Sequence, residues 1–282
     1  DLVRIRSILD RNDVFTANEY IDMVGRGDPL PTSEPKCDVF TEFFPTAFRA
    51  IDRRMNSDKP PKNSDLIRQI SARSSDFFGI DMKRVPGAQA EQAATMIKSW
   101  FDLKWKTNEV NPDKLRTVLS AVGWNVLDIK VRPEGRRLWV DLETEPLTDR
   151  ELCPLPQYGS VARGRYTMLC LWERPSEEEV LTTIRGKSNA PVIVLYFGRM
   201  TETRRRNLAA LCISKQQCAL VIDDAVMFFI CGQRGIRLPA LFACTFPFTF
   251  CGPYSTTAGL VPPEVFYGRK SEQHEIQDPF GS

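Results

Sequence analysis

The feature that most constrains the fold is an alternation of wholly apolar segments with helical segments between residues 176 and 231. Residues 191–197 and 218–222 are continuous apolar runs of strand length, and Thr201 opens a segment of helical periodicity between them. A strand that is apolar on both faces must be covered on both sides, and crossovers through helices make neighbouring strands parallel. The pattern therefore predicts an α/β domain whose last strands are parallel.

Upstream of this alternation, the sequence predicts two helices, a hairpin and a further strand. Asn111 is positioned to cap the second helix, and Gly123 is positioned to end it. Two β-rich runs then flank Pro133 and Gly135, which is typical of a hairpin. The expected strands include residues 124–131, 137–143 and 166–172. The predicted fold class is α/β, a mixed sheet flanked by helices in the order α, β, β, β, α, β, α, β, α, with a helical N-terminal region.

The chain length of 282 residues exceeds what one hydrophobic core usually organises. Residues 1–80 are predicted to form the helical N-terminal region, residues 81–237 the α/β domain, and residues 238–282 a connector. The apolar run at 238–254 is too short for a membrane span and contains three prolines, so we expect it to be buried in the protein. We expect the chain to be part of a longer protein that continues after Ser282.

The cysteines, the single histidine and the net charge limit the possible chemistry. None of the eight cysteines forms a Cys-x-x-Cys pair, so no zinc site is predicted. His274 is the only histidine, which disfavours a Ser-His-Asp or Cys-His centre. Most cysteines lie in apolar runs, which is typical of reduced thiols in a cytoplasmic protein. The net charge of +2 excludes a uniformly basic surface but leaves room for a local one.

Arginines gather at two places in the α/β region. One group precedes the strand at 166–172, and the other follows the strand at 191–197. If the two groups meet at one edge of the sheet, they could contact the phosphates of a nucleic acid. The alternative interpretation is the ordinary charged face of a helix. The candidate nucleic-acid contacts are Arg163, Arg165, Arg199, Arg204, Arg205 and Arg206.

The order and spacing of the elements in residues 110–232 resemble the restriction-endonuclease fold of Mrr-like nucleases. Active members of that family hold a divalent metal between an Asp on the second strand and a Glu or Gln on the third, with a Lys nearby. Asp141 matches the first role and Glu143 could add a second carboxylate, but the strand at 166–172 lacks the acidic residue and the lysine. The resemblance implies a nuclease-like fold without catalysis. A metal-dependent nuclease that uses Asp141 and Glu143 is the alternative.

A second resemblance lies near the end of the chain. The run from Val265 to Arg269, followed by Glu272, is similar to the short motif that precedes the phosphate loop in STAND and related AAA-type ATPases. In that family the hydrophobic residues pack beside the adenine, and the Gly-Arg turn helps to form the nucleotide pocket. The resemblance implies that ATP and Mg²⁺ bind to the parent protein, and that no cofactor binds to these 282 residues alone. The implied lip of the nucleotide site consists of Phe266, Tyr267, Gly268 and Arg269.

These expectations describe a non-catalytic sensor or regulatory module of a larger STAND-type ATPase. We expect the parent to be a cytoplasmic protein of bacterial antiviral defence or signalling. The expected partners are its own downstream ATPase domain and a nucleic-acid or protein ligand, with no membrane. Binding of that ligand would shift the conformational equilibrium that gates the ATPase. A purely structural scaffold is the third possibility.

Overall fold

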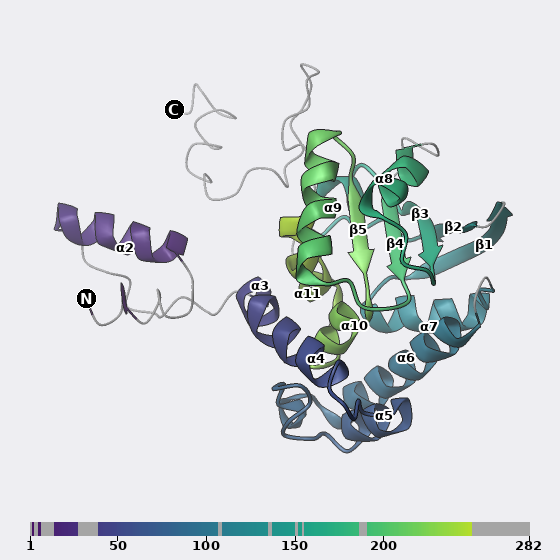
Figure 1. Cartoon of the computed structure of the whole chain (residues 1–282), viewed down its shortest axis with the longest axis horizontal. Helices are drawn as coiled ribbons and strands as arrows, with labels where there is room; N and C mark the ends of the chain where they lie inside the picture. Colours follow the sequence, from purple (N-terminus) through teal and green to yellow (C-terminus); the bar gives the residue numbers. More distant parts are fainter. Residues whose placement is uncertain are drawn as a thin grey trace, which may run out of the picture.

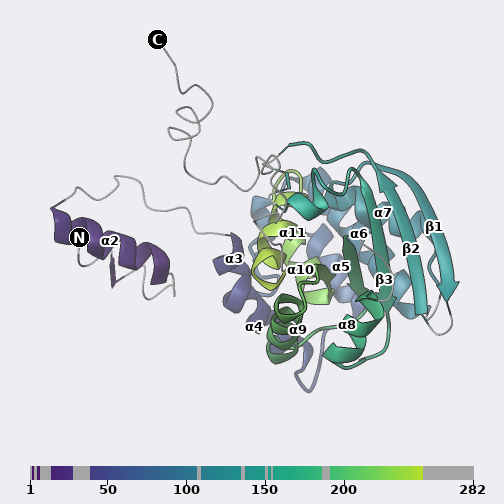
Figure 2. The same cartoon turned by 90° about the horizontal axis from the view of Figure 1, so that it is seen from above.

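The computed structural model describes residues 2, 5–6, 14–27, 39–106, 109–134, 137–149, 152–153, 155–185 and 191–249. Most of these residues form an α/β body in which a twisted sheet lies between two layers of helices (Figures 1 and 2). Helix α2 (Val14–Arg26) lies apart from that body in both views.

The sheet is mixed, as the sequence predicts. Its five strands follow the order β1-β2-β3-β4-β5. The pairs β1–β2 and β2–β3 are antiparallel, whereas β3–β4 and β4–β5 are parallel. The strands are β1 (Val126–Glu134), β2 (Arg137–Thr144), β3 (Arg165–Leu171), β4 (Val192–Tyr196) and β5 (Ala219–Ile222). The predicted fold class and the order of elements from α7 (Pro112–Val122) to α10 (Asp224–Cys231) are therefore confirmed.

The helices around the sheet begin and end where capping residues place them. The side chain of Asn111 accepts hydrogen bonds from the N–H groups of Asp113 and Lys114, and Gly123 ends the same helix at a φ of +130°. Thr201 and Asp223 cap two further helices through their side chains. The helices around the sheet are α6 (Gly87–Trp105), α7 (Pro112–Val122), α8 (Glu177–Arg185), α9 (Glu202–Ser214), α10 (Asp224–Cys231) and α11 (Leu238–Thr245).

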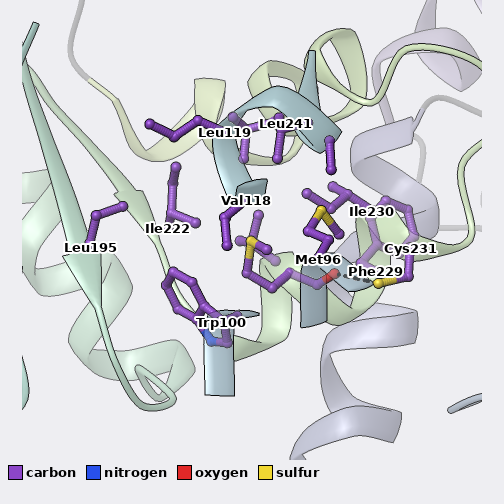
Figure 3. Close-up of a cluster of buried hydrophobic side chains, with 14 of the residues drawn as sticks. Met96, Trp100, Val118, Leu119, Leu195, Ile222, Phe229, Ile230, Cys231 and Leu241 are labelled. Carbon is purple, nitrogen blue, oxygen red and sulfur yellow. Dashed lines mark hydrogen bonds between the residues drawn. The ribbon is translucent and has the colours of Figure 1, made fainter. Parts of the chain in front are cut away.

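Two hydrophobic layers hold the sheet between the helices. The larger layer joins one face of the strands to α6, α7, α10 and α11, with Trp100, Leu195 and Phe229 near its centre (Figure 3). The smaller layer joins the opposite face to α8 and α9, where Trp139 and Val194 are buried. Because side chains alternate along a strand, β4 contributes to both layers and is apolar throughout. This double coverage is the physical reason for the continuous apolar runs in the sequence.

The larger layer also includes helices from outside residues 81–237. Phe48 of α4 (Phe48–Met55), Leu66 of α5 (Asn63–Ser71) and Phe242 of α11 belong to the same buried cluster as the sheet. Short helical segments complete the described part, and they are α3 (Val39–Thr41), η1 (Glu42–Ala47), η2 (Met82–Arg84), η3 (Pro156–Tyr158) and η4 (Phe246–Phe248). Hydrophobic packing thus crosses both predicted boundaries, at 80/81 and 237/238.

The described residues of the apolar run at 238–254 are mostly buried, as the sequence predicts. Helix α11 buries Leu238, Leu241 and Phe242 against α7, α10 and the sheet. Among the described residues, no helix is both long enough and apolar enough to cross a membrane.

Candidate functional site

The two candidate carboxylates of a nuclease lie on the outer face of the β1–β2 hairpin. Helices α8 and α9 cover this side of β3 to β5, whereas β1 and β2 extend beyond them (Figure 2). Across the strands, Asp141 lies opposite Lys130, whereas Glu143 lies opposite Asp128 on one side and Arg165 on the other. Carboxylates and cations are therefore mixed on this face.

Asp141 is already paired with a cation of its own hairpin. Arg132 donates from Nε to Oδ2 at 2.5 Å and from Nη2 to Oδ1 at 2.7 Å, so both carboxylate oxygens are engaged. The hydrogen bond to Asp141 raises the pKa of Arg132 above its ordinary value. Within the described ranges, no group of three or more His, Cys, Asp or Glu side chains is placed to hold a metal ion. The nuclease alternative stays a prediction, and this face offers it no cluster of oxygen ligands.

A different hollow lies at the carboxyl ends of the parallel strands. Its volume is about 390 Å³, and its walls come from the segments that follow β3 and β4, the starts of α9 and α10, and the ends of α4 and α6. Ligands of open α/β sheets commonly bind outside the carboxyl ends of the strands. We call this hollow the carboxyl-end cleft. Its charged lining consists of Lys104, Arg174, Arg199, Arg204, Asp52 and Asp224.

Asp224 is a buried carboxylate in the lining of the cleft. Its Oδ1 accepts a hydrogen bond from Trp100 Nε1 at 2.8 Å, and its Oδ2 accepts one from Lys104 Nζ at 2.5 Å. Burial raises the pKa of Asp224, and the Lys104 ammonium offsets only part of that increase. The Lys104 side chain keeps 36% of its surface exposed, and an ammonium has three N–H donors. Lys104 can therefore hold Asp224 and still donate to a ligand in the cleft.

Arg199 and Arg174 have guanidinium N–H groups that are not used within the described part of the chain. Arg199 Nη2 donates to Asn56 Oδ1, while its buried Nε lies 3.9 Å from Asp52 and makes no hydrogen bond with the described part of the chain. Arg174 follows β3, is exposed, and forms no ion pair with any other described residue. The Arg174 guanidinium is therefore open to an anion, whereas Arg199 keeps an unused donor but is also held by Asn56 and Asp52.

Arg204 lines the cleft but also fastens two helices together. Its Nε donates to Glu177 Oε1 at 2.8 Å and its Nη1 to the Tyr196 hydroxyl at 3.3 Å, and Nη2 donates to the Pro175 carbonyl. These bonds tie the start of α9 to the start of α8. Arg206 lies outside the cleft lining, where it pairs with Glu202 at 3.2 Å.

Arg205 does not contact solvent, contrary to its prediction as a nucleic-acid contact. It faces the core from α9 because it lies one helical turn after Thr201, on the same side as Leu208. Its side chain is 2% exposed, and Nη2 donates to Asp223 Oδ2 at 2.6 Å. Asp223 also accepts from the N–H groups of Met200 and Val226. This buried pair holds the loop after β4 against α10.

Arg163 and Arg165 lie at the opposite end of the sheet from the cleft. Arg165 begins β3, whereas Arg199 follows β4, and these two strands are parallel. The seven residues of β3 separate the two groups by roughly 20 Å along the strand. The condition that the two groups meet is therefore not fulfilled, because the start of β3 and the end of the parallel strand β4 lie at opposite ends of the sheet.

No family model, curated protein or solved structure matches this chain. Any function must therefore be inferred from the geometry of the carboxyl-end cleft. The implied nucleotide-site lip at 266–269 lies outside the described residues.

Sequence reasoning missed most of the residues that form this cleft. Trp172 and Arg174 could have been found, because they directly follow a predicted strand and strand ends form ligand sites. Lys104 carries no such signal, since it lies at the end of a helix far away in the sequence. Asp224 is recognisable in the sequence only as a helix start, and its contact with Lys104 depends on how α6 packs against α10.

Proposed function

We propose that this chain is a non-catalytic recognition module that binds nucleic acid in the carboxyl-end cleft and regulates an ATPase domain that follows it. The observation that carries the proposal is the convergence of four cations and two carboxylates, which gives the lining a charge of +2. Two of these cations, Arg174 and Arg199, are incompletely paired within the described chain. Such a cleft attracts phosphate groups, whose neutralisation dominates nucleic-acid affinity.

The backbone around the cleft supports the same choice of ligand. Thr201 lines the cleft and caps the N-terminus of α9, a helix of 13 residues. The unpaired N–H groups and the dipole of a helix N-terminus favour an anion there. Gly198, in the turn between β4 and this helix, also lines the cleft. The cations, the N-terminus of α9 and the turn before it therefore all favour binding of a phosphate group in the cleft.

The position of the cleft also fits a regulatory role. Lys104 and Asp224 join α6 to the start of α10, and α10 packs against α4 and α11. A phosphate that competes for Lys104 would change the pairing of Asp224 and so act on α10. Helix α11 then leads the chain toward its C-terminal segment, where the resemblance to STAND-type ATPases lies. Ligand binding would in this way shift the equilibrium that controls the ATPase.

The test measures the ATPase rate of the full-length protein with and without added nucleic acid. We expect nucleic acid to change the rate in the native protein and in an Arg185→Glu variant, whose exposed arginine ends α8 at the other end of the sheet. We expect an Arg174→Glu variant to lose the response. Deletion of residues 39–249 should also change the basal rate. An unchanged basal rate together with no response to nucleic acid would contradict the proposal and favour a scaffold.

A further inference from the structure

We propose that the ligand of the carboxyl-end cleft is single-stranded nucleic acid, with one unpaired base held against Trp172. This inference rests on the proposed function and narrows its ligand. It depends on two observations: an aromatic wall in the cleft and the size of the cleft.

The aromatic wall is rigid before any ligand binds. Trp172 is half-buried, and its Nε1 donates a hydrogen bond to the Leu103 carbonyl at 3.0 Å. Its ring stacks on Phe197 at a centroid distance of 4.8 Å, and Trp100 packs on Phe197 at the same distance. The polar N–H of Trp172 is thus already used inside the protein. What the side chain offers to the cleft is the aromatic surface, on which a base can stack.

The aromatic wall stands in the same cleft as the cations. Trp172 is followed two residues later by Arg174, and both side chains line the cleft. Proteins that bind single strands combine a positively charged groove with aromatic rings on which successive bases stack.

The size of the cleft favours a single nucleotide unit. A volume of about 390 Å³ is at the lower end of the range for small-molecule sites, roughly 300–1,000 Å³. A duplex keeps its bases paired and stacked inside, so only its backbone could reach the cations. An unpaired base can enter the cleft while its phosphate contacts Arg174 or Arg199. An acidic peptide would satisfy the cations but has no base to place on Trp172.

The experiment is a competition assay with the 282-residue chain and a fluorescent oligothymidylate of about 12 nucleotides, at low salt. The competitors are the unlabelled oligomer, an abasic oligomer of equal length, a duplex, oligoglutamate and thymidine monophosphate. We expect the abasic oligomer to bind roughly 5- to 150-fold more weakly than the oligothymidylate, which corresponds to about 1–3 kcal/mol for base stacking. The duplex and the peptide should compete poorly.

Two substitutions separate the aromatic contribution from the fold. Trp172→Leu removes the wall of the cleft, and Trp172→Phe keeps an aromatic ring there. We expect Trp172→Leu to weaken binding of the oligothymidylate at least fivefold while binding of the abasic oligomer is unchanged, and Trp172→Phe to recover part of the loss. Phe246→Leu is the control, because Phe246 is 52% exposed and does not line the cleft.

The outcomes distinguish this inference from the proposed function. If neither the labelled oligothymidylate nor a labelled duplex binds at low salt, the proposed function itself is wrong, whereas binding of the labelled duplex alone overturns only the inference of a single strand. If duplex or abasic competitors bind as well as the oligothymidylate, the proposed function stands and the inference of a single strand is overturned. If thymidine monophosphate competes as well as the oligothymidylate, the ligand is a free nucleotide and the inference of a single strand is overturned. Equal competition by oligoglutamate would also overturn that inference.

Discussion

The outer face of the β1–β2 hairpin and the carboxyl-end cleft contain the same kinds of charged residue in different arrangements. On the hairpin, Asp141 and Arg132 neutralise each other on adjacent strands, and both side chains are more than 40% exposed. In the cleft, Lys104 and Asp224 meet from helices that are 120 residues apart, and the carboxylate is 1% exposed. The hairpin pairs its charges locally, whereas the cleft gathers them from several elements.

This difference shows why charged residues in a sequence are weak indicators of a site. Charged side chains on a strand can pair with oppositely charged neighbours on the adjacent strands, so they keep few hydrogen-bonding groups that could bind a ligand. Charges at the ends of strands and helices lack such neighbours, and buried ones must find specific partners. The following predictions test the contrast, beginning with the largest expected effect.

The largest effect should come from the buried ion pair behind the cleft. Asp223→Ala would leave Arg205 buried without a counter-charge and would remove the cap of α10. We expect the free energy of unfolding to fall by about 3–5 kcal/mol. Urea denaturation followed by circular dichroism measures this loss. A loss below about 1 kcal/mol is typical of an exposed ion pair. It would contradict the claim that the ion pair behind the cleft contributes more to stability than the pair on the hairpin.

The pH dependence of stability should report the burial of Asp224 in the cleft. Because the pKa of Asp224 is raised above 3.8 in the folded protein, the folded state binds the proton more tightly than the unfolded state does. The stability of the native protein relative to Asp224→Asn should therefore fall as pH rises from about 4, by up to about 1.4 kcal/mol per pH unit within the titration window. Denaturation midpoints between pH 4 and 7 measure this slope.

A rise in relative stability with pH in the Asp224→Asn comparison would mean that the attraction of Lys104 outweighs burial and lowers the pKa of Asp224, which would contradict the prediction.

A smaller effect is expected when one negative charge of the cleft is removed. Asp52→Asn would raise the charge of the lining by one and would release Arg199, whose Nε lies 3.9 Å from the carboxylate. We expect binding of a fluorescent oligonucleotide to become about threefold to tenfold tighter at low salt. Glu143→Gln makes the same change of charge on the hairpin face and should leave the dissociation constant unchanged. If both variants bind the oligonucleotide equally more tightly, the net charge of the chain and not a specific site attracts it.

The smallest effect is expected from Asp141→Ala. Because the Arg132–Asp141 pair is exposed, its loss should change the free energy of unfolding by less than about 1 kcal/mol. We also expect the native chain to leave plasmid DNA uncut in Mg²⁺ or Mn²⁺. Cleavage by the native chain that disappears in Asp141→Ala would establish the nuclease alternative and would reverse the roles assigned to the two regions.

Local signals in the sequence are sufficient to predict the fold. The apolar run at 191–197 requires a strand covered on both faces, and Asn111, Thr201 and Asp223 mark helix starts through short-range hydrogen bonds. Such features depend on neighbours within a few residues, so they can be read without tertiary contacts.

The candidate site could be predicted only in part, because it depends on long-range packing. Arg199, one of the predicted contacts, lines the cleft, but Arg205 in the same cluster is buried against Asp223. Which arginine of a helix faces the core depends on the direction in which the helix packs. Lys104 enters the cleft only because α6 ends beside α10, and no spacing in the sequence reveals this contact.

The most direct test of the binding site compares charge reversal in the two regions. Fluorescence anisotropy with a labelled oligonucleotide would give dissociation constants for the native 282-residue chain, Arg174→Glu in the cleft and Lys130→Glu on the hairpin, over a series of salt concentrations. We predict that Arg174→Glu weakens binding and lowers the salt slope by about one, while Lys130→Glu leaves both near their native values. Loss of binding in Lys130→Glu with native binding in Arg174→Glu would contradict the assignment of the cleft.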